Sequence, residues 1–156
     1  MNITDVLAVE HVTFCAVFDQ IERVLPSLRT RAEIQMLVGL VESLLRDHGD
    51  AEQNLAYLAL DHVLKERGQL DQLYQDHKEM DVQLKHVRRA RTVAEARRLL
   101  RAVLVASREH FRREERTIFP LMQKVLQSET LEKLGELWVR QQRSLASRAT
   151  SRSRDL

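Results

Sequence analysis

Histidine and glutamate recur at matching points in the two halves of the chain. His48 and Glu52 form a His-x-x-x-Glu unit, and His110 and Glu114 form a second unit 62 positions later. One further histidine lies ahead of each unit, and these two are His11 and His77. Because residues four apart share one face of an α-helix, each unit aims an imidazole and a carboxylate at the same point. The repeat therefore predicts a metal site inside a bundle of four helices.

The fold class follows from the helical spacing of apolar residues along nearly the whole chain. The sequence has only four glycines and two prolines among 156 residues, which favours long helices. Thr30 with Glu33, and Thr92 with Glu95, form capping-box sequences that begin the second and fourth helices. Short connections between helices imply antiparallel neighbours. We therefore predict an all-α protein, an up-down-up-down antiparallel four-helix bundle with an additional C-terminal helix.

The chain divides into three regions. We expect residues 1–126 to form the bundle, residues 127–147 the C-terminal helix, and residues 148–156 a basic flexible tail. The connection between the second and third helices is harder to place. Equal heights of their histidines require a helix end or a bend around Asp61, whereas the obvious helix breaker, Gly68, comes later. We therefore expect an irregular stretch between this point and the third helix.

The helical spacing makes two detailed predictions for the second and fourth helices. Helical spacing places Leu55 and Ala59 on the stripe of the first His-x-x-x-Glu unit, and Ile118 and Leu121 on the stripe of the second. Pro120 lies where the fourth helix should still be running. Proline lacks a backbone N–H and crowds the preceding turn, so we expect a kink or a break near Ile118.

Carboxylates on an apolar helix face require a counter-charge. An unpaired carboxylate buried among apolar side chains costs several kcal/mol or shifts its pKa until it is neutral. A pair of divalent metal ions removes this cost, because imidazole nitrogens bind each ion and carboxylates bridge the two. The candidate ligands all fall on predicted inward faces, and they are His11, His48, Glu52, His77, His110 and Glu114.

Five other residues are candidates for the same site. Asp81 lies four residues after the third-helix histidine, so it is either a seventh metal ligand or a solvated charge at the edge of the stripe. Glu115 competes with its neighbour for the bridging role, although the spacing favours the neighbour. Tyr74 is either a hydrogen-bond partner of a ligand or an ordinary packing residue. Phe14 and Phe111 are expected to line the pocket and exclude water.

Other polar residues have a simpler interpretation. His62 and His86 are expected to be ordinary core or boundary histidines, and Glu10 and Glu79 surface residues. Cys15 is the only cysteine, so an intrachain disulfide is excluded and a reducing compartment is expected. It either approaches the metal or, as we favour, is a small buried apolar residue.

These motifs resemble the hemerythrin-like, or HHE cation-binding, family over about residues 5–126. The motifs that carry the resemblance are lone His11, His48-x-x-x-Glu52, the stretch Tyr74-Gln75-Asp76-His77-Lys78-Glu79, and His110-Phe111-Arg112-Arg113-Glu114-Glu115 leading to Ile118-Phe119-Pro120. The resemblance implies an antiparallel four-helix bundle that holds two non-haem iron ions. Family members carry or sense dioxygen, act on peroxide or nitric oxide, or handle iron.

Two stretches depart from the oxygen-carrying members of that family. Those members have histidine at both ends of the third-helix motif, where this chain has His77 and Asp81. In its first half, Gln53 and Ala56-Tyr57 stand where Glu-Glu and Phe-Pro elements are common. A carboxylate ligand would favour the ferric state and admit manganese or a mixed iron–manganese pair. Three hypotheses follow: a protein that binds, senses or stores O2, a redox enzyme acting on peroxide, O2 or NO, and an iron-handling or repair protein.

The expected partner is a small molecule: O2, peroxide or NO. The C-terminal arginines lack interleaved aromatic residues and a recognisable binding motif, so no nucleic-acid partner is expected. No apolar run reaches the roughly 18 residues of a membrane span, and no signal-peptide pattern is seen, so we expect a cytoplasmic protein without a membrane partner. The C-terminal helix around Trp138 either covers the bundle or mediates homodimer formation.

Overall fold

A computed structural model of the chain describes residues 1–64, 68 and 70–152. Every regular element in these ranges is helical. In chain order the elements are α1 (Ile3–Val24), η1 (Leu25–Ser27), α2 (Arg31–Ala51), η2 (Glu52–Tyr57), α3 (Leu58–Val63), α4 (Asp71–Arg89), α5 (Val93–Arg113), η3 (Glu114–Ile118), α6 (Phe119–Val125) and α7 (Ser128–Arg152). The element η1 is a 3-10 helix, whereas η2 and η3 are π-helical turns.

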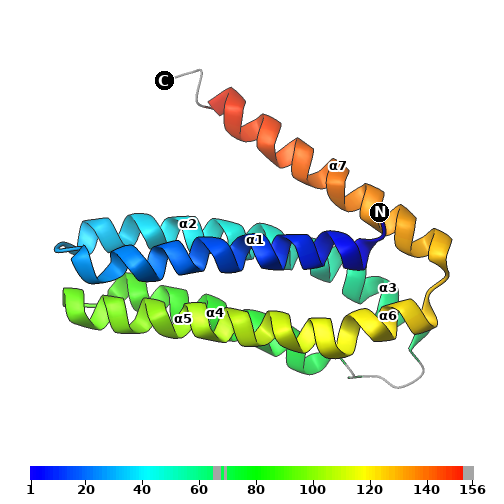
Figure 1. The fold of residues 1–156 in the computed structure, drawn as a ribbon, viewed down its shortest axis with the longest axis horizontal. Coiled ribbons are helices and arrows are strands. Elements are labelled where there is room, and N and C mark those ends of the chain that lie inside the picture. The colour runs from blue at the N-terminus through cyan, green and yellow to red at the C-terminus, as the bar shows by residue number, and fades with distance from the viewer. Residues whose placement is uncertain (65–67, 69, 153–156) are drawn as a thin grey trace.

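Four long helical runs lie lengthwise beside one another (Figure 1). The first run is α1, the second joins α2, η2 and α3, the third is α4, and the fourth joins α5, η3 and α6. Helix α4 packs most extensively against α5 and also contacts α2, while α1 contacts α5 and α7. The described chain is therefore a helical bundle, as the spacing of its apolar residues predicts.

Side-chain caps fix where two of these runs begin. At the start of α2 the Glu33 backbone N–H donates to Thr30 Oγ1 at 3.2 Å, and the Thr30 N–H donates to the Glu33 carboxylate at 2.8 Å. At the start of α5 the Glu95 N–H donates to Thr92 Oγ1 at 3.1 Å, but the Glu95 carboxylate accepts from Arg91 instead. Both predicted helix starts are confirmed, and each lies 18 residues before a histidine of the repeat.

The second run ends close to its predicted limit. Helix α3 ends at Val63, two residues beyond Asp61, and α4 begins at Asp71. Between them Gly68 has a φ of +84°, a conformation that glycine adopts without the steric cost it has for other residues. Residues 65–67 and 69, where the rest of the irregular stretch was expected, lie outside the described residues.

Two apolar clusters fill the bundle and leave a polar layer between them. The first contains, among others, Phe14, Phe18, Val38, Val41, Leu84, Leu100 and Phe111. The second contains, among others, Ile3, Leu7, Tyr57, Leu60, Phe119, Met122 and Trp138. Along each helical run the histidines and glutamates of the repeat fall between these clusters. The polar side chains are thereby held away from solvent at the middle of the bundle.

Helix α7 crosses the N-terminal end of α1 and then projects away from the bundle (Figure 1). Trp138 is 1% exposed and packs in the second apolar cluster, so this part of α7 covers the bundle. Helix α7 runs to Arg152, past the limit of 147 expected from the sequence. Of the predicted flexible tail, residues 153–156 lie outside the described residues.

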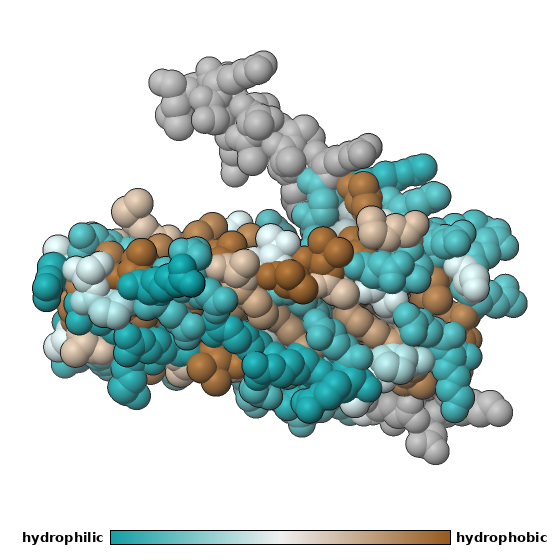
Figure 2. Space-filling view, in the orientation of Figure 1, coloured by the Kyte–Doolittle hydropathy of each residue, from teal (hydrophilic) through white to brown (hydrophobic). Residues whose placement is uncertain are grey.

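The visible face of the molecule is mixed in character. Figure 2 shows hydrophilic side chains over most of this face, with hydrophobic side chains between them. Exposed apolar residues on α1 include Val9, which is 59% exposed, and Val12, which is 70% exposed. Among the residues that the structure describes, no helix combines the length and the apolar content needed to cross a membrane.

Candidate metal centre

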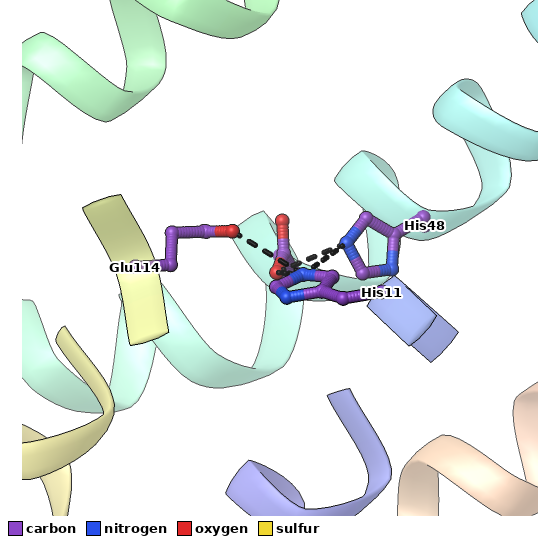
Figure 3. Close-up of side chains that lie close together, drawn as sticks. His11, His48 and Glu114 are labelled. Carbon is purple, nitrogen blue, oxygen red and sulfur yellow. Dashed lines mark hydrogen bonds and ion pairs between the residues drawn. The ribbon is translucent and has the colours of Figure 1, made fainter. Parts of the chain in front are cut away.

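Six side chains from the four helical runs converge in the polar layer. They form two groups, His11 with His48, Glu52 and Glu114, and His77 with His110, Glu52 and Glu114. Within each group, one donor atom per residue lies within 4.8 Å of all the others. We call the two groups the His11/His48 end and the His77/His110 end. Figure 3 shows His11 between His48 and Glu114, joined to both by close contacts.

The two glutamates belong to both ends. Glu52 places Oε1 3.2 Å from His48 Nε2 and Oε2 3.5 Å from His77 Nε2, so its two oxygens face opposite ends. Glu114 Oε2 lies 3.4 Å from His11 Nε2 and 3.5 Å from His110 Nε2. This is the arrangement expected of carboxylates that bridge two ions.

Each glutamate is also the first residue of a π-helical turn. Element η2 begins at Glu52 and η3 begins at Glu114. Isolated π-helical turns inside α-helices occur frequently at functional sites, because they re-aim side chains without ending the helix. The break predicted near Pro120 is therefore present as η3, but η2 forms without any proline. What the two π-helical turns have in common is that each begins at a glutamate of the repeat.

The π-helical turns change which residues face the core beyond the glutamates. After η2 begins, Ala56, Tyr57 and Leu60 are buried, whereas Leu55 and Ala59 are only partly buried. After η3, Met122 is buried in place of its neighbour. The strict α-helical stripe predicted from the sequence holds at Ile118, which is buried, but is shifted by one residue at Leu55, Ala59 and Leu121. A π-helical turn contains one residue more than an α-helical turn, so the positions that follow it are shifted by one.

The outer nitrogen of each imidazole contacts a further side chain. Three partners are carboxylates: His11 Nδ1 lies 3.0 Å from Glu115, His48 Nδ1 lies 2.9 Å from Glu10, and His110 Nδ1 lies 3.2 Å from Asp76. The fourth partner is an amide, since His77 Nδ1 lies 2.8 Å from Gln53 Nε2. A carboxylate accepts hydrogen bonds, so in neutral imidazoles it places the proton on Nδ1 and leaves the Nε2 lone pair facing the centre.

The donor set at the centre fits cations. The Nε2 atoms of His11 and His48 lie 3.1 Å apart, and those of His77 and His110 lie 2.8 Å apart. Both oxygens of Glu52 and Oε2 of Glu114 are buried without a hydrogen-bond partner. Such oxygens are costly in an apolar core unless a positive charge faces them. Imidazole and carboxylate donors together suit iron, manganese and related divalent ions.

The electrostatics of the cluster point the same way. Burial raises the pKa of Glu114, and the nearby charge of Glu52 raises it further. Burial alone would lower the pKa of His48, but Glu52 and Glu10 outweigh it and raise this pKa to about 10. At the other end, burial lowers the pKa of His110 to about 4. The cluster therefore binds protons that cations would have to displace.

The residues predicted to surround the ligands fall close to them in three cases. Phe111 stacks on His11 with a centroid distance of 4.2 Å, and Phe14 meets His48 edge-on at 5.2 Å. Glu114 and Glu115 divide the roles between them, because Glu114 is in the cluster while Glu115 backs His11.

Asp81 and Tyr74 are not brought to the cluster. Asp81 is exposed and belongs to neither group, although it lines a small cavity beside His77. The next core position of α4 after His77 is occupied by Met80, which is buried. Asp81, one residue later, therefore lies off the core face. The Tyr74 hydroxyl donates to Asp61 at 3.2 Å. Another tyrosine, Tyr57, contacts the cluster instead.

Four contributors were not predicted from the sequence: Tyr57, Glu10, Gln53 and Asp76. The buried Tyr57 hydroxyl donates to Glu114, and its ring stacks on His77 at 5.8 Å. Glu10 is not the free surface residue that was expected, because its carboxylate accepts from His48.

A local signal could have found three of these residues. Glu10 precedes the ligand His11, Asp76 precedes His77, and Gln53 follows Glu52, just as Glu115 follows Glu114. These three residues and Glu115 nevertheless each contact the outer nitrogen of a histidine on another helical run. Polar residues directly beside the ligands in sequence are therefore the signal, and the bundle geometry assigns their partners.

The remaining polar candidates lie away from the centre. His62 and His86 are exposed, and neither belongs to a metal-binding group of the described residues. Cys15 is partly buried, and burial raises the pKa of its thiol. It belongs to neither group, which agrees with its interpretation as a small packing residue.

A family model for the hemerythrin HHE cation binding domain matches residues 2–122. The chain belongs to this family. The matched region contains all six clustered side chains and ends inside α6, so α7 lies beyond it. No curated protein and no solved structure matches the chain. The family and the His/Glu cluster together make this a metal-binding protein of the hemerythrin-like type.

Proposed function

We propose that this chain is a non-haem di-iron protein that binds dioxygen or a related small oxidant. Its fold would be an up-down-up-down antiparallel four-helix bundle with an additional C-terminal helix. One ion would be held by His11 and His48, the other by His77 and His110, with the two glutamates bridging them. Manganese or a mixed pair suits the same donors. The observation that supports this most strongly is the set of buried glutamate oxygens without hydrogen-bond partners among four imidazole nitrogens.

A bound pair of ions would supply redox-active Lewis acids to which a small oxidant can bind. The chain's own residues make the two ends differ in access. Phe14 and Phe111 pack against the imidazoles of the His11/His48 end, whose side chains are 2% exposed. A cavity of about 50 Å³ adjoins His77 and is bounded by Leu45, Arg46, Gly49, Asp50, Gln53, Met80 and Asp81. A larger cavity of about 440 Å³ adjoins His11, so cavity volume does not separate the two ends. The His77 side chain is 11% exposed and that of His11 is 2% exposed, so we place the entry of the oxidant at His77.

A second candidate is a redox enzyme that turns over peroxide, O2 or NO, and Tyr57 favours it. The Tyr57 hydroxyl is buried and donates to Glu114 Oε1. It can therefore hold a proton at a carboxylate that both ends share. A Tyr57→Phe variant keeps the ring but removes this proton, so a selective loss of peroxide turnover would favour the enzyme. Unchanged turnover would leave the hydroxyl a structural role.

The visible spectrum of iron-loaded protein tests the proposal. Protein loaded with ferrous iron without oxygen would be exposed to air and then returned to vacuum. A charge-transfer band that appears and then disappears is expected for reversible oxygen binding. Irreversible decay of the band to a ferric species would favour the redox enzyme. A protein that binds iron but gives no band with O2, peroxide or NO would contradict oxidant binding.

A further inference from the structure

Helix α7 reaches the metal centre through one side chain. The Trp138 indole N–H donates to Glu10 Oε1 at 2.9 Å, and the other oxygen of the same carboxylate lies 2.9 Å from His48 Nδ1. The Trp138 ring also meets the His48 ring edge-on, with centroids 5.6 Å apart. A residue outside the matched family domain is thus two hydrogen bonds from a clustered imidazole nitrogen.

The Glu10 carboxylate needs such a partner to hold its place. Its side chain is 21% exposed, so water competes with His48 for the carboxylate oxygens and the side chain can adopt several rotamers. The indole N–H is a donor only, so it fixes one oxygen and aims the other at His48. Among the side chains that the structure describes, none on α7 donates to Glu115 or Asp76. Glu115 is 42% exposed, and Asp76 is held instead by Gln72 and Arg113.

The position of Trp138 is itself fixed by close packing of α7 on the start of α1. A Cβ added at Gly135 would lie 2.4 Å from the backbone oxygen of Met1, so only glycine allows this approach. One turn later Trp138 is 1% exposed and packs in the cluster that contains Ile3 and Leu7. The indole therefore cannot leave Glu10 unless α7 moves.

We propose that α7 is part of the metal centre. Trp138 acts through Glu10 as a positioning residue that orients His48 for the ion at the His11/His48 end. Because linkage between two binding events is reciprocal, binding of this ion and docking of α7 stabilise each other. This inference rests on the proposed function only in requiring that the cluster binds metal.

The experiment is a titration of the full chain with Co²⁺, whose absorption reports each occupied site, against a competing chelator. Trp138 is the only tryptophan and lies against His48, so its fluorescence responds more strongly to an ion at the His11/His48 end. Trp138→Phe keeps a ring but removes the N–H, and Glu10→Gln keeps the shape but removes the charge. We expect each to weaken one of two ions by about 10–100-fold, as changes behind a metal ligand do. Leu137→Ala, at an exposed neighbour on α7, is the matched control and should leave both affinities unchanged.

Two further variants separate positioning from general stability. Asp76→Asn should weaken the other ion and leave the quenching of Trp138 fluorescence by the first ion unchanged. Gly135→Ala touches no polar group of the centre, yet it should displace α7 and weaken the same ion as Trp138→Phe. In the reciprocal arm, Co²⁺ should slow amide hydrogen exchange in the part of α7 around Trp138.

Wild-type binding of two ions together with wild-type affinities in Trp138→Phe, Glu10→Gln and Gly135→Ala would overturn the positioning role and leave the proposed function standing. A folded wild-type chain that binds no Co²⁺, Fe²⁺ or Mn²⁺ would overturn both. If Trp138→Phe lacks the helical circular dichroism of the wild type, Glu10→Gln decides the question.

Discussion

The two ends of the cluster contain the same ligand types in different surroundings. At the His11/His48 end both outer nitrogens face carboxylates, and aromatic rings from α1, α5 and α7 surround the imidazoles. At the other end His110 is backed by Asp76 but His77 by the Gln53 amide, and cavities adjoin both His77 and His11. The side chain of His77 is 11% exposed, whereas those of the other three histidines are 2% exposed.

This difference separates retention of an ion from access to it. A carboxylate behind an imidazole makes the imidazole a more basic ligand and fixes its orientation, whereas the Gln53 amide N–H donates to His77 Nδ1 and fixes the orientation without adding basicity. Burial among aromatic rings excludes water and exchangeable ligands. The His11/His48 end is therefore expected to retain its ion, and the His77/His110 end to admit a small molecule. The sequence repeat is symmetric, so the asymmetry comes from the residues behind the ligands.

The largest effect is expected from removing a glutamate that both ends share. Glu52→Ala deletes two oxygens that face opposite ends, so it should abolish binding of at least one ion and weaken the other. Glu114→Ala should act in the same direction. Metal analysis of purified protein measures the effect, with the exposed Glu79→Ala as the control. Full occupancy in both glutamate variants would contradict the bridging roles.

The pH dependence of stability should differ between the two ends in protein stripped of metal. The pKa of His48 is raised from 6.5 to about 10, so the folded state keeps a proton that the unfolded state loses, and the free energy of unfolding should fall as the pH rises across this interval. The pKa of His110 is lowered to about 4, so its contribution is present above pH 6.5 and is lost as the pH falls toward 4.

Urea unfolding across both pH intervals checks these signs. His48→Gln should remove the alkaline fall, and His110→Gln should reduce the acid loss. Metal loading should reverse the alkaline trend, since ions compete with protons for the same imidazoles. An alkaline fall of the same size in His48→Gln would show that another group causes it.

A smaller effect is expected from making the two ends alike. Gln53→Glu would place a carboxylate behind His77, as Glu10 stands behind His48, and should tighten the ion at the His77/His110 end by about tenfold. Gln53→Ala, which removes the partner altogether, is the matched comparison and should weaken that ion. Chelator competition measures both variants. Identical affinities in the two variants would mean that the asymmetry has another origin.

The smallest effect is expected at Asp81, which is exposed and belongs to neither group. Asp81→Ala should change the affinity of either ion by no more than about twofold, as exposed substitutions usually do. The same titration measures it. Loss of an ion in this variant would make Asp81 a ligand and place the entry of the oxidant elsewhere.

Much of the fold and the six clustered residues could be predicted because both depend on local spacing. Residues four apart on a helix share a face, which was enough to pair His48 with Glu52 and His110 with Glu114. The same rule failed at Asp81, because His77 already lies at the edge of the core face of α4. It held at Ile118 but failed elsewhere beyond the glutamates, where π-helical turns shift the register and bury Ala56, Leu60 and Met122 in place of Leu55, Ala59 and Leu121.

The residues behind the ligands could not be predicted in the same way. Glu10, Gln53 and Asp76 each stand beside one ligand in sequence but contact a histidine of another helical run. That pairing depends on how the runs pack against each other, which single-helix periodicity does not determine. The contact of Trp138 with Glu10 spans 128 positions and depends on the docking of α7.

The number of ferrous ions bound per chain, measured by anaerobic titration with a chelator back-titration, tests the central claim most directly. The account predicts two ions per chain, with the chelator removing one well before the other. It also predicts that the ion retained longer is the one that quenches Trp138 fluorescence more strongly. Binding of one ion or none, or simultaneous loss of two equivalent ions, would contradict a bridged and asymmetric pair.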